Sequence, residues 1–227
     1  MPLVIRCLLL CVLLWAALPL AGQVAALRAY AEAQYGSDDR LVRGRTYYLA
    51  HPGAMGHPFL MEEWTASRLE VADAVFEGVW LRYDLTTQEL ILRKTDAAGV
   101  QTWIVLSPTV VTAFELGAQR FLSLAGPAGS YAGQVYLGRD SLLICYRKTF
   151  LRQYSAVTPQ GAYGDTEQRV YLLRDQVWLP IAGRRDLLAC YAGRRAAIKT
   201  YWRQQRLHFD RLDAPHWRAL LEYCEQE

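Results

Sequence analysis

The stretch from Gly78 to Lys94 reads GVWLRYDLTTQELILRK, and it decides the fold class of this chain. Val79, Leu81 and Tyr83 alternate with their neighbours at a period of two, which is typical of a half-buried strand. The turn LTTQ then leads into a second extended run, ELILR. Two such runs joined by a short polar turn predict an antiparallel hairpin.

More segments of this kind surround the hairpin between residues 41 and 182, beginning with an expected strand at 41–49. They predict about nine to eleven strands joined by short turns, which indicates an antiparallel meander forming a curved sheet or partial barrel. Residues 141–154 are long for one strand, so we expect a bend or bulge there. The polar segment 155–165 is expected to be an exposed excursion.

One cross-strand contact is predicted within the central hairpin. Asp84 and Arg93 lie on its two strands, and we interpret them as a surface ion pair. Such a pair contributes less than about 1 kcal/mol to stability.

From Arg184 onward the apolar period changes to 3.6 residues, which predicts two to three short helices. Leu187 and Leu188 share a face of the first, and 194–206 forms the second. Asp213 is a suitable N-cap for the third. Helices after a run of strands indicate an α+β, mostly antiparallel β domain at 41–182, with a helical tail at 183–227 packed on its sheet.

The N-terminus predicts export. Residues 1–22 hold one positive side chain, a short apolar run and then Pro19 with small residues, which is the layout of a signal peptide. Cleavage is expected after Gly22, or as late as Ala26, leaving 23–40 as a leader segment. The alternative is a membrane anchor, but the run is shorter than the roughly 20 residues that a spanning helix needs. We therefore expect a periplasmic or extracellular mature chain that does not span the membrane.

The cysteines of the mature chain are Cys145, Cys190 and Cys224, each among apolar neighbours. We interpret them as small core residues, with a Cys190–Cys224 disulfide as the alternative. No CxxC pair is present in the sequence, which argues against a redox motif or a zinc knuckle, and no cofactor is expected.

Several segments carry a family resemblance. They are GHPFLMEEW (Gly56–Trp64), LRYDL (Leu81–Leu85), YLL (Tyr171–Leu173) and the basic C-terminal stretch RRDLLACYAGRRAAIKTYWRQQRLHF. In these the chain resembles a broad family of uncharacterised secreted β-rich proteins from Bacteroidota-type bacteria. That family has no assigned activity, so the resemblance implies location and fold rather than chemistry.

Motifs for catalysis are weak. His51 and His57, with Glu62 or Glu63, form the one candidate metal set, yet the sequence has no HExxH pattern, so an ordinary loop is the preferred interpretation. The sequence also has no GxSxG elbow and no glycine-rich phosphate loop. We therefore expect a protein that is not an enzyme.

The basic stretch 184–211 is the strongest candidate for binding. Eight cations minus two carboxylates give +6 there, against +3 for the whole chain. The cations predicted to contact an anionic surface, such as lipid head groups, are Arg184, Arg185, Arg194, Arg195, Lys199, Arg203 and Arg206. A solvated helix face, with the side-chain stems packed on the sheet, is nevertheless the preferred interpretation of this stretch. Nucleic acid would be an unusual partner for an exported chain.

Two functions follow as hypotheses. The first is an exported cell-envelope protein that acts as a non-enzymatic interaction or structural module, with an envelope protein or lipid as partner. The alternative is a periplasmic carrier that holds a lipid or other apolar ligand in the curved sheet. A filled, dry core would count against the carrier.

Overall fold

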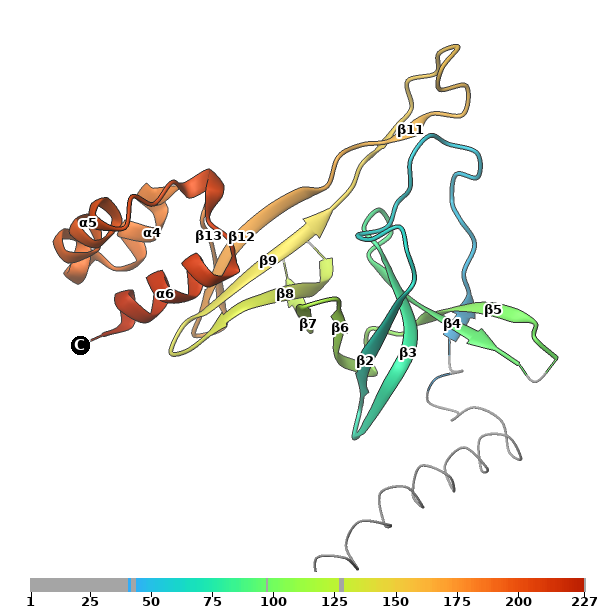
Figure 1. Ribbon diagram of the computed structural model, residues 1–227, viewed down its shortest axis with the longest axis horizontal. Coiled ribbons are helices and arrows are strands. Elements are labelled where there is room, and N and C mark those ends of the chain that lie inside the picture. Colours follow the sequence, from blue (N-terminus) through green and yellow to red (C-terminus); the bar gives the residue numbers. More distant parts are fainter. Residues whose placement is uncertain (1–40, 42–43, 97, 127–128, 227) are drawn as a thin grey trace, which may run out of the picture.

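The strands form one eleven-stranded sheet and one two-stranded sheet in the computed structural model, which describes residues 41, 44–96, 98–126 and 129–226 (Figure 1). The predicted signal peptide and leader segment lie outside the described residues. The large sheet contains β1 (Gly44–Thr46), β2 (Thr65–Val71), β3 (Ala74–Asp84), β4 (Glu89–Thr95), β5 (Gln101–Leu106), β6 (Val111–Leu116), β7 (Gln119–Gly126), β8 (Gly129–Leu137), β9 (Ser141–Arg147), β12 (Glu167–Arg174) and β13 (Val177–Pro180). The small sheet contains β10 (Phe150–Leu151) and β11 (Ala162–Tyr163).

The strand order in the large sheet is β1-β5-β4-β3-β2-β6-β7-β8-β9-β12-β13, and each of these pairings is antiparallel. The predicted class, mostly antiparallel β with C-terminal helices, is confirmed, and the sheet is open, with β1 and β13 at its edges. The predicted meander is interrupted once, because β6 pairs with β2 instead of β5. The second edge of β5 is already occupied by β1, so β6 extends the sheet from the free edge of β2.

The central hairpin is β3–β4, joined by a turn at 85–88 as predicted. Its register contradicts the predicted ion pair, because the four-residue turn places Asp84 opposite Glu89 and Trp80 opposite Arg93. Asp84 is buried instead, and its carboxylate accepts a hydrogen bond from the Tyr47 hydroxyl at 2.8 Å. The predicted first strand at 41–49 is also shorter: β1 ends at Thr46, and Tyr47 turns inward to reach this carboxylate.

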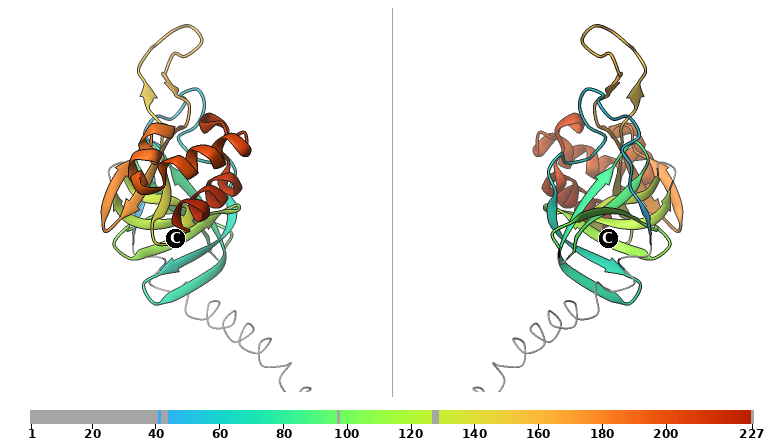
Figure 2. Two further views of the ribbon diagram at one scale, coloured as in Figure 1. Left: turned by 90° about the vertical axis from the view of Figure 1, so that its left-hand side faces the viewer. Right: turned by 90° about the vertical axis from the view of Figure 1, so that its right-hand side faces the viewer.

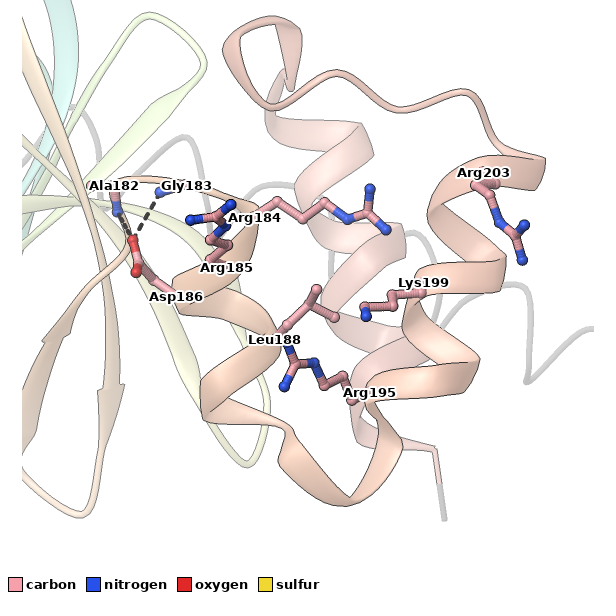
Figure 3. Close-up of a pocket in the computed structure, with 9 residues that line it drawn as sticks. All are labelled: Ala182, Gly183, Arg184, Arg185, Asp186, Leu188, Arg195, Lys199 and Arg203. Atoms are coloured by element: carbon pink, nitrogen blue, oxygen red, sulfur yellow. Dashed lines mark hydrogen bonds between the residues drawn. The ribbon is translucent and has the colours of Figure 1, made fainter.

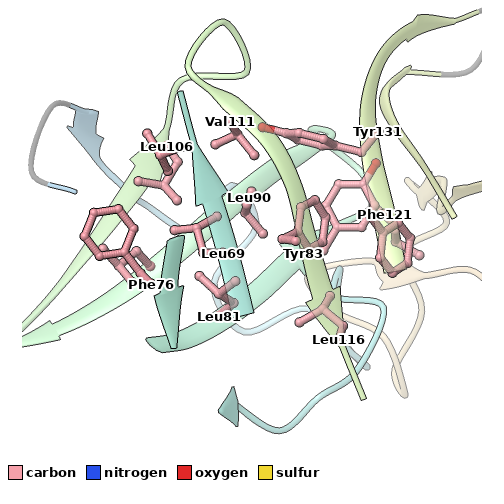
Figure 4. Packing of buried hydrophobic residues seen from close by; sticks show 14 residues of the cluster. Leu69, Phe76, Leu81, Tyr83, Leu90, Leu106, Val111, Leu116, Phe121 and Tyr131 are labelled. Atoms are coloured by element: carbon pink, nitrogen blue, oxygen red, sulfur yellow. The ribbon is translucent and has the colours of Figure 1, made fainter. Parts of the chain in front are cut away.

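The first hydrophobic core gathers side chains from β2 to β8 (Figure 4). Tyr83 lies at its centre and contacts Phe114, Phe121 and Tyr131 edge to face, with ring centroids 5.6 to 5.9 Å apart. Aromatic pairs of this geometry add about 0.5–1.5 kcal/mol beyond the area that they bury. The rings of the core therefore fill the space between these strands.

The helices pack at the other end of the sheet, beside β8, β9, β12 and β13 (Figures 1 and 2). They are α4 (Arg184–Cys190), α5 (Arg195–Gln204) and α6 (Ala214–Glu225), with short 3-10 turns at Ala192–Arg194 and Phe209–Arg211. Asp213 caps α6 as predicted, accepting from the His216 amide at 2.9 Å. Apolar helix residues such as Leu187 and Leu221 are fully buried against Val135 and Leu142 of the sheet.

Residues 141–154 divide into two strands, as the predicted bend requires. β9 ends at Arg147 and β10 begins at Phe150. Between them Lys148 turns its side chain inward, where its ammonium donates to the carbonyls of His57 and Phe59 at 3.0 Å each. A buried ammonium needs such acceptors, so Lys148 fixes the loop before Phe59 to the sheet.

Candidate anion-binding groove

A groove of about 900 Å³ lies between α4 and α5 (Figure 3). Five of the seven predicted cations line it: Arg184, Arg185, Arg195, Lys199 and Arg203. The remaining lining consists of Ala182, Gly183, Asp186 and Leu188. The groove therefore extends from the residues that follow β13 across α4 to α5.

The cations of α5 face the groove because the opposite side of this helix is apolar. Arg195, Lys199 and Arg203 recur every four residues, so they share one face over roughly 12 Å of helix. Ile198 and Trp202 are buried on the other side and hold the helix in this rotation. Figure 3 shows Arg195 and Lys199 pointing from α5 toward Leu188 of α4.

The groove has a surplus of positive charge. Its single carboxylate, Asp186, accepts hydrogen bonds from the amides of Ala182 and Gly183 at 2.9 and 3.0 Å, and so caps α4. Among the described residues, none of the five cations forms an ion pair with a carboxylate. Five cations against one carboxylate leave a local charge of +4. Such a site attracts anions at a distance set by the ionic strength.

Arg184 is the most enclosed of the groove cations. It is half-buried, and its guanidinium carbon lies 5.4 Å from the centre of the Trp202 ring. Its Nε is buried, and no hydrogen-bond acceptor in the described part of the chain reaches it. A buried donor without an acceptor costs about 1–3 kcal/mol.

Several of the cations also occupy helix positions that disfavour positive charge. Arg184 and Arg185 begin α4, and Arg195 begins α5, whose first turn contains no acidic residue. A cation at a helix N-terminus interacts unfavourably with the helix dipole, which lowers the stability of the helix by about 0.3–1 kcal/mol at low salt. Residues that break a local stability rule in this way are typical of binding sites.

The other two predicted cations lie outside the groove. The guanidinium of Arg194 is 5.2 Å from the Tyr223 ring centre and lines a separate pocket with Arg139 and Arg174. Arg206 follows the end of α5, where its φ of 50° is left-handed. Sequence reasoning identified the charges but not this division, and it missed the capping role of Asp186.

Trp202 and Tyr201 are interleaved with the cations in the sequence, but neither lines the groove. The Trp202 indole is buried and donates to the Leu207 carbonyl at 2.7 Å. Tyr201 stacks on Tyr223 with ring centroids 4.2 Å apart. Both rings therefore support the helices from the apolar side.

The histidines of the alternative metal set are used elsewhere. His51 stacks on Phe150 with centroids 3.6 Å apart, and His57 Nδ1 lies 3.5 Å from the Lys148 ammonium. Burial, and then the charge of Lys148, lower the pKa of His57. The described residues contain no group of three or more histidine, cysteine or acidic side chains placed to hold a metal ion.

The alternative of a Cys190–Cys224 disulfide is contradicted by the structure. Cys145, Cys190 and Cys224 are all free thiols. Burial raises the pKa of Cys145 to about 11 and that of Cys224 to about 12. Because the thiolate is the reactive form, these two cysteines are inert core residues in the folded chain.

Comparison with protein-family models, with curated proteins and with solved structures finds no match. The family resemblance therefore stays a prediction. Within the described residues, α4, α5 and α6 are too short and too polar to cross a bilayer, and the same holds for the 3-10 turns. The geometry of the groove thus carries the functional argument.

Proposed function

We propose that this chain is an exported, non-enzymatic interaction module of the cell envelope, and that its groove binds an anionic surface. The observation that carries the proposal is the cluster of five cations without carboxylate partners around one groove. The export part rests on the sequence of residues 1–22. Phosphate head groups of lipids are the expected contacts, because guanidinium forks and ammonium groups bind phosphate oxygens well.

The expected affinity follows from the number of cations. A basic residue near an anionic membrane contributes about 1 kcal/mol, so removing three of the five weakens binding by about 3 kcal/mol, or roughly 150-fold. The attraction is screened by salt, so it falls as ionic strength rises. If the groove binds by electrostatic attraction, its affinity for anionic vesicles therefore depends strongly on salt concentration.

The test is co-sedimentation of the chain from residue 23 onward with vesicles of phosphatidylglycerol and phosphatidylcholine, at low salt. The groove variant is Arg195→Gln with Lys199→Gln and Arg203→Gln. The matched control is Arg147→Gln with Arg206→Gln and Arg218→Gln, which removes the same charge from exposed positions outside the groove. We expect the groove variant to lose binding and the control to keep most of it. Equal losses would show general charge attraction and contradict the proposal.

We also infer that the large sheet is curved. The segment from Leu106 to Val111 spans at most about 18 Å when extended. A flat sheet would separate β5 from β6 by four strand spacings, or roughly 19 Å. The segment is in fact a turn, in which the amides of Val110 and Val111 donate to the Ser107 carbonyl. Curvature of the intervening strands is the simplest way to bring β5 and β6 together.

The packing inside this curve favours the interaction module over the carrier. Tyr83, Phe114, Phe121 and Tyr131 are almost fully buried at the position where a carrier would hold its ligand. Native mass spectrometry of protein purified without detergent tests this point. We expect the mass of the chain alone, whereas a bound lipid-like mass would favour the carrier.

A further inference from the structure

The loop between β10 and β11 projects beyond the other described elements (Figures 1 and 2). It presents two large apolar side chains to solvent, Tyr154 at 66% exposure and Val157 at 78%. Burying such side chains is the main favourable contribution to protein association and to membrane binding. Their position at the tip of a projecting hairpin therefore calls for a physical explanation.

The loop is ordered by its own hydrogen bonds. The Ser155 hydroxyl accepts from the amides of Val157 and Thr158 at 3.2 and 3.0 Å. The Ser155 amide donates to the Thr158 carbonyl, and the Thr158 hydroxyl donates to the Gln153 carbonyl. These bonds give the backbone internal partners near the tip and hold the two apolar side chains outward.

A second loop supports the first. The Met55 amide donates to the Gly161 carbonyl at 3.0 Å, and the Tyr163 amide donates to the Met55 carbonyl at 2.9 Å. His51 stacks on Phe150 beside these bonds. The side chains of Met55 and Leu151 are exposed as well, so the two loops together offer apolar groups at one end of the molecule.

Charge is nearly absent from both loops. Residues 47–61 contain no acidic or basic side chain apart from the two histidines, and residues 149–164 contain only Arg152. The loops thus contain no carboxylate that would be repelled by an anionic membrane or lose its hydration on insertion. The composition is that of a surface suited to a lipid interface.

We propose that this tip inserts Tyr154, Val157 and their neighbours into the interfacial region of a lipid bilayer. Tyrosine is favoured at that depth, since its ring is apolar and its hydroxyl remains hydrated. A narrow projecting loop offers little of the roughly 800 Å² per partner that a stable protein interface buries. A bilayer, in contrast, accepts a few side chains from any direction, so a membrane fits this shape better than a protein.

This inference concerns a different surface and a different force from the groove. Insertion of apolar side chains is insensitive to salt, whereas contacts of the groove with phosphate are screened. Binding to neutral phosphatidylcholine vesicles at high salt therefore measures insertion of the tip, because the electrostatic attraction of the groove is screened under these conditions. A negative result for insertion of the tip therefore leaves anion binding by the groove untouched, and the reverse also holds.

The experiment measures partition of the chain from residue 23 onward into such vesicles. The tip variant is Tyr154→Asp with Val157→Asp, and the control is Val100→Asp with Val177→Asp, two exposed valines outside the tip. Because each aspartate removes an apolar side chain that would be buried in the bilayer, we expect the partition coefficient of the tip variant to fall at least about tenfold. The control is expected to stay within about twofold of the original chain.

A direct probe of depth completes the test. In a Val157→Trp variant, we expect brominated phosphatidylcholine to quench a larger share of the tryptophan fluorescence than in the original chain, whose six tryptophans from residue 23 onward all lie outside the loop between β10 and β11. Circular dichroism verifies that each variant is folded. The proposal is overturned if the original chain does not bind the vesicles at high salt, or if the tip and control aspartate variants lose binding equally. It is also overturned if Val157→Trp shows no added quenching, or if the tip crosslinks to a protein and not to lipid.

Discussion

At the residue scale, Asp140 adds buried hydrogen bonds to the apolar packing that holds the helices against the sheet. It is fully buried before β9, and its carboxylate accepts from the Arg174 guanidinium at 2.8 and 2.5 Å and from the Tyr191 hydroxyl at 2.6 Å. The hydrogen bonds from Arg174 hold the pKa of Asp140 below its usual range. Its amide also donates to Glu225 of α6 at 2.8 Å. One residue thus connects the sheet with α4 and α6.

The sign of the pH dependence follows from this lowered pKa. The stabilisation is fully present above the usual carboxyl pKa of about 3.9 and is lost as the pH falls through the lower folded value. Asp140→Asn is expected to reduce the free energy of unfolding at pH 7 by about 3 kcal/mol, because Arg174 loses its charged partner. It should also flatten the decline of stability below about pH 4. Urea denaturation across pH measures both effects.

The matched control is Asp175→Asn, which changes an exposed carboxylate next to Arg174 in the turn between β12 and β13. We expect it to change stability by less than about 0.5 kcal/mol. A similar loss in both variants would show that the Asp140 contacts contribute little.

At the scale of the element, α5 has cations at both ends of its groove face. Arg195 begins the helix, where positive charge opposes the dipole, and Arg203 lies in its last turn, where positive charge is favourable. Both residues line the groove. Arg195 and Arg203 are therefore expected to have opposite effects on the stability of the helix but the same effect on binding.

Two charge reversals test this separation. Arg195→Glu is expected to raise the free energy of unfolding by about 0.5 kcal/mol at low salt, and Arg203→Glu to lower it by a similar amount. Both are expected to weaken binding to anionic vesicles. Thermal denaturation and co-sedimentation of the two variants provide the readouts. If Arg195→Glu destabilised the chain, Arg195 would have a structural role that its position in the helix does not predict.

At the scale of the whole molecule, the two largest hydrophobic cores share one sheet. The first lies among β2 to β8, while the second covers β8, β9 and β12 with the three α-helices. Because β8 contributes Tyr131 to one core and Val135 to the other, we expect both to unfold together. The helical tail is then a part of the domain and not a separate unit.

The free thiols report on this coupling. Cys145 belongs to the sheet and Cys224 to α6, and both are buried. Leu221→Ala, a substitution in α6, is expected to cost about 2–5 kcal/mol and to lower the urea midpoint for labelling of both thiols equally. Mass spectrometry of labelled peptides distinguishes the two sites. Earlier labelling of Cys224 alone would indicate a helical unit that unfolds by itself.

The sequence by itself determined the features that depend on neighbouring residues. The β3–β4 hairpin, the break after β9 and the Asp213 cap of α6 were all predicted correctly, because side-chain alternation, turn composition and capping act within a few residues. The clustering of the groove cations is also visible in the sequence, whereas their contact with an anionic surface stays a prediction.

Only the tertiary structure decided which of these elements and charges meet. It paired β6 with β2, buried Asp84 with Tyr47 instead of pairing it with Arg93, and turned Arg194 away from the groove onto Tyr223. These choices depend on which apolar faces are buried together by residues far apart in the chain. Burial is a property of the assembled core, so a local pattern specifies the charges of the groove but not the groove itself.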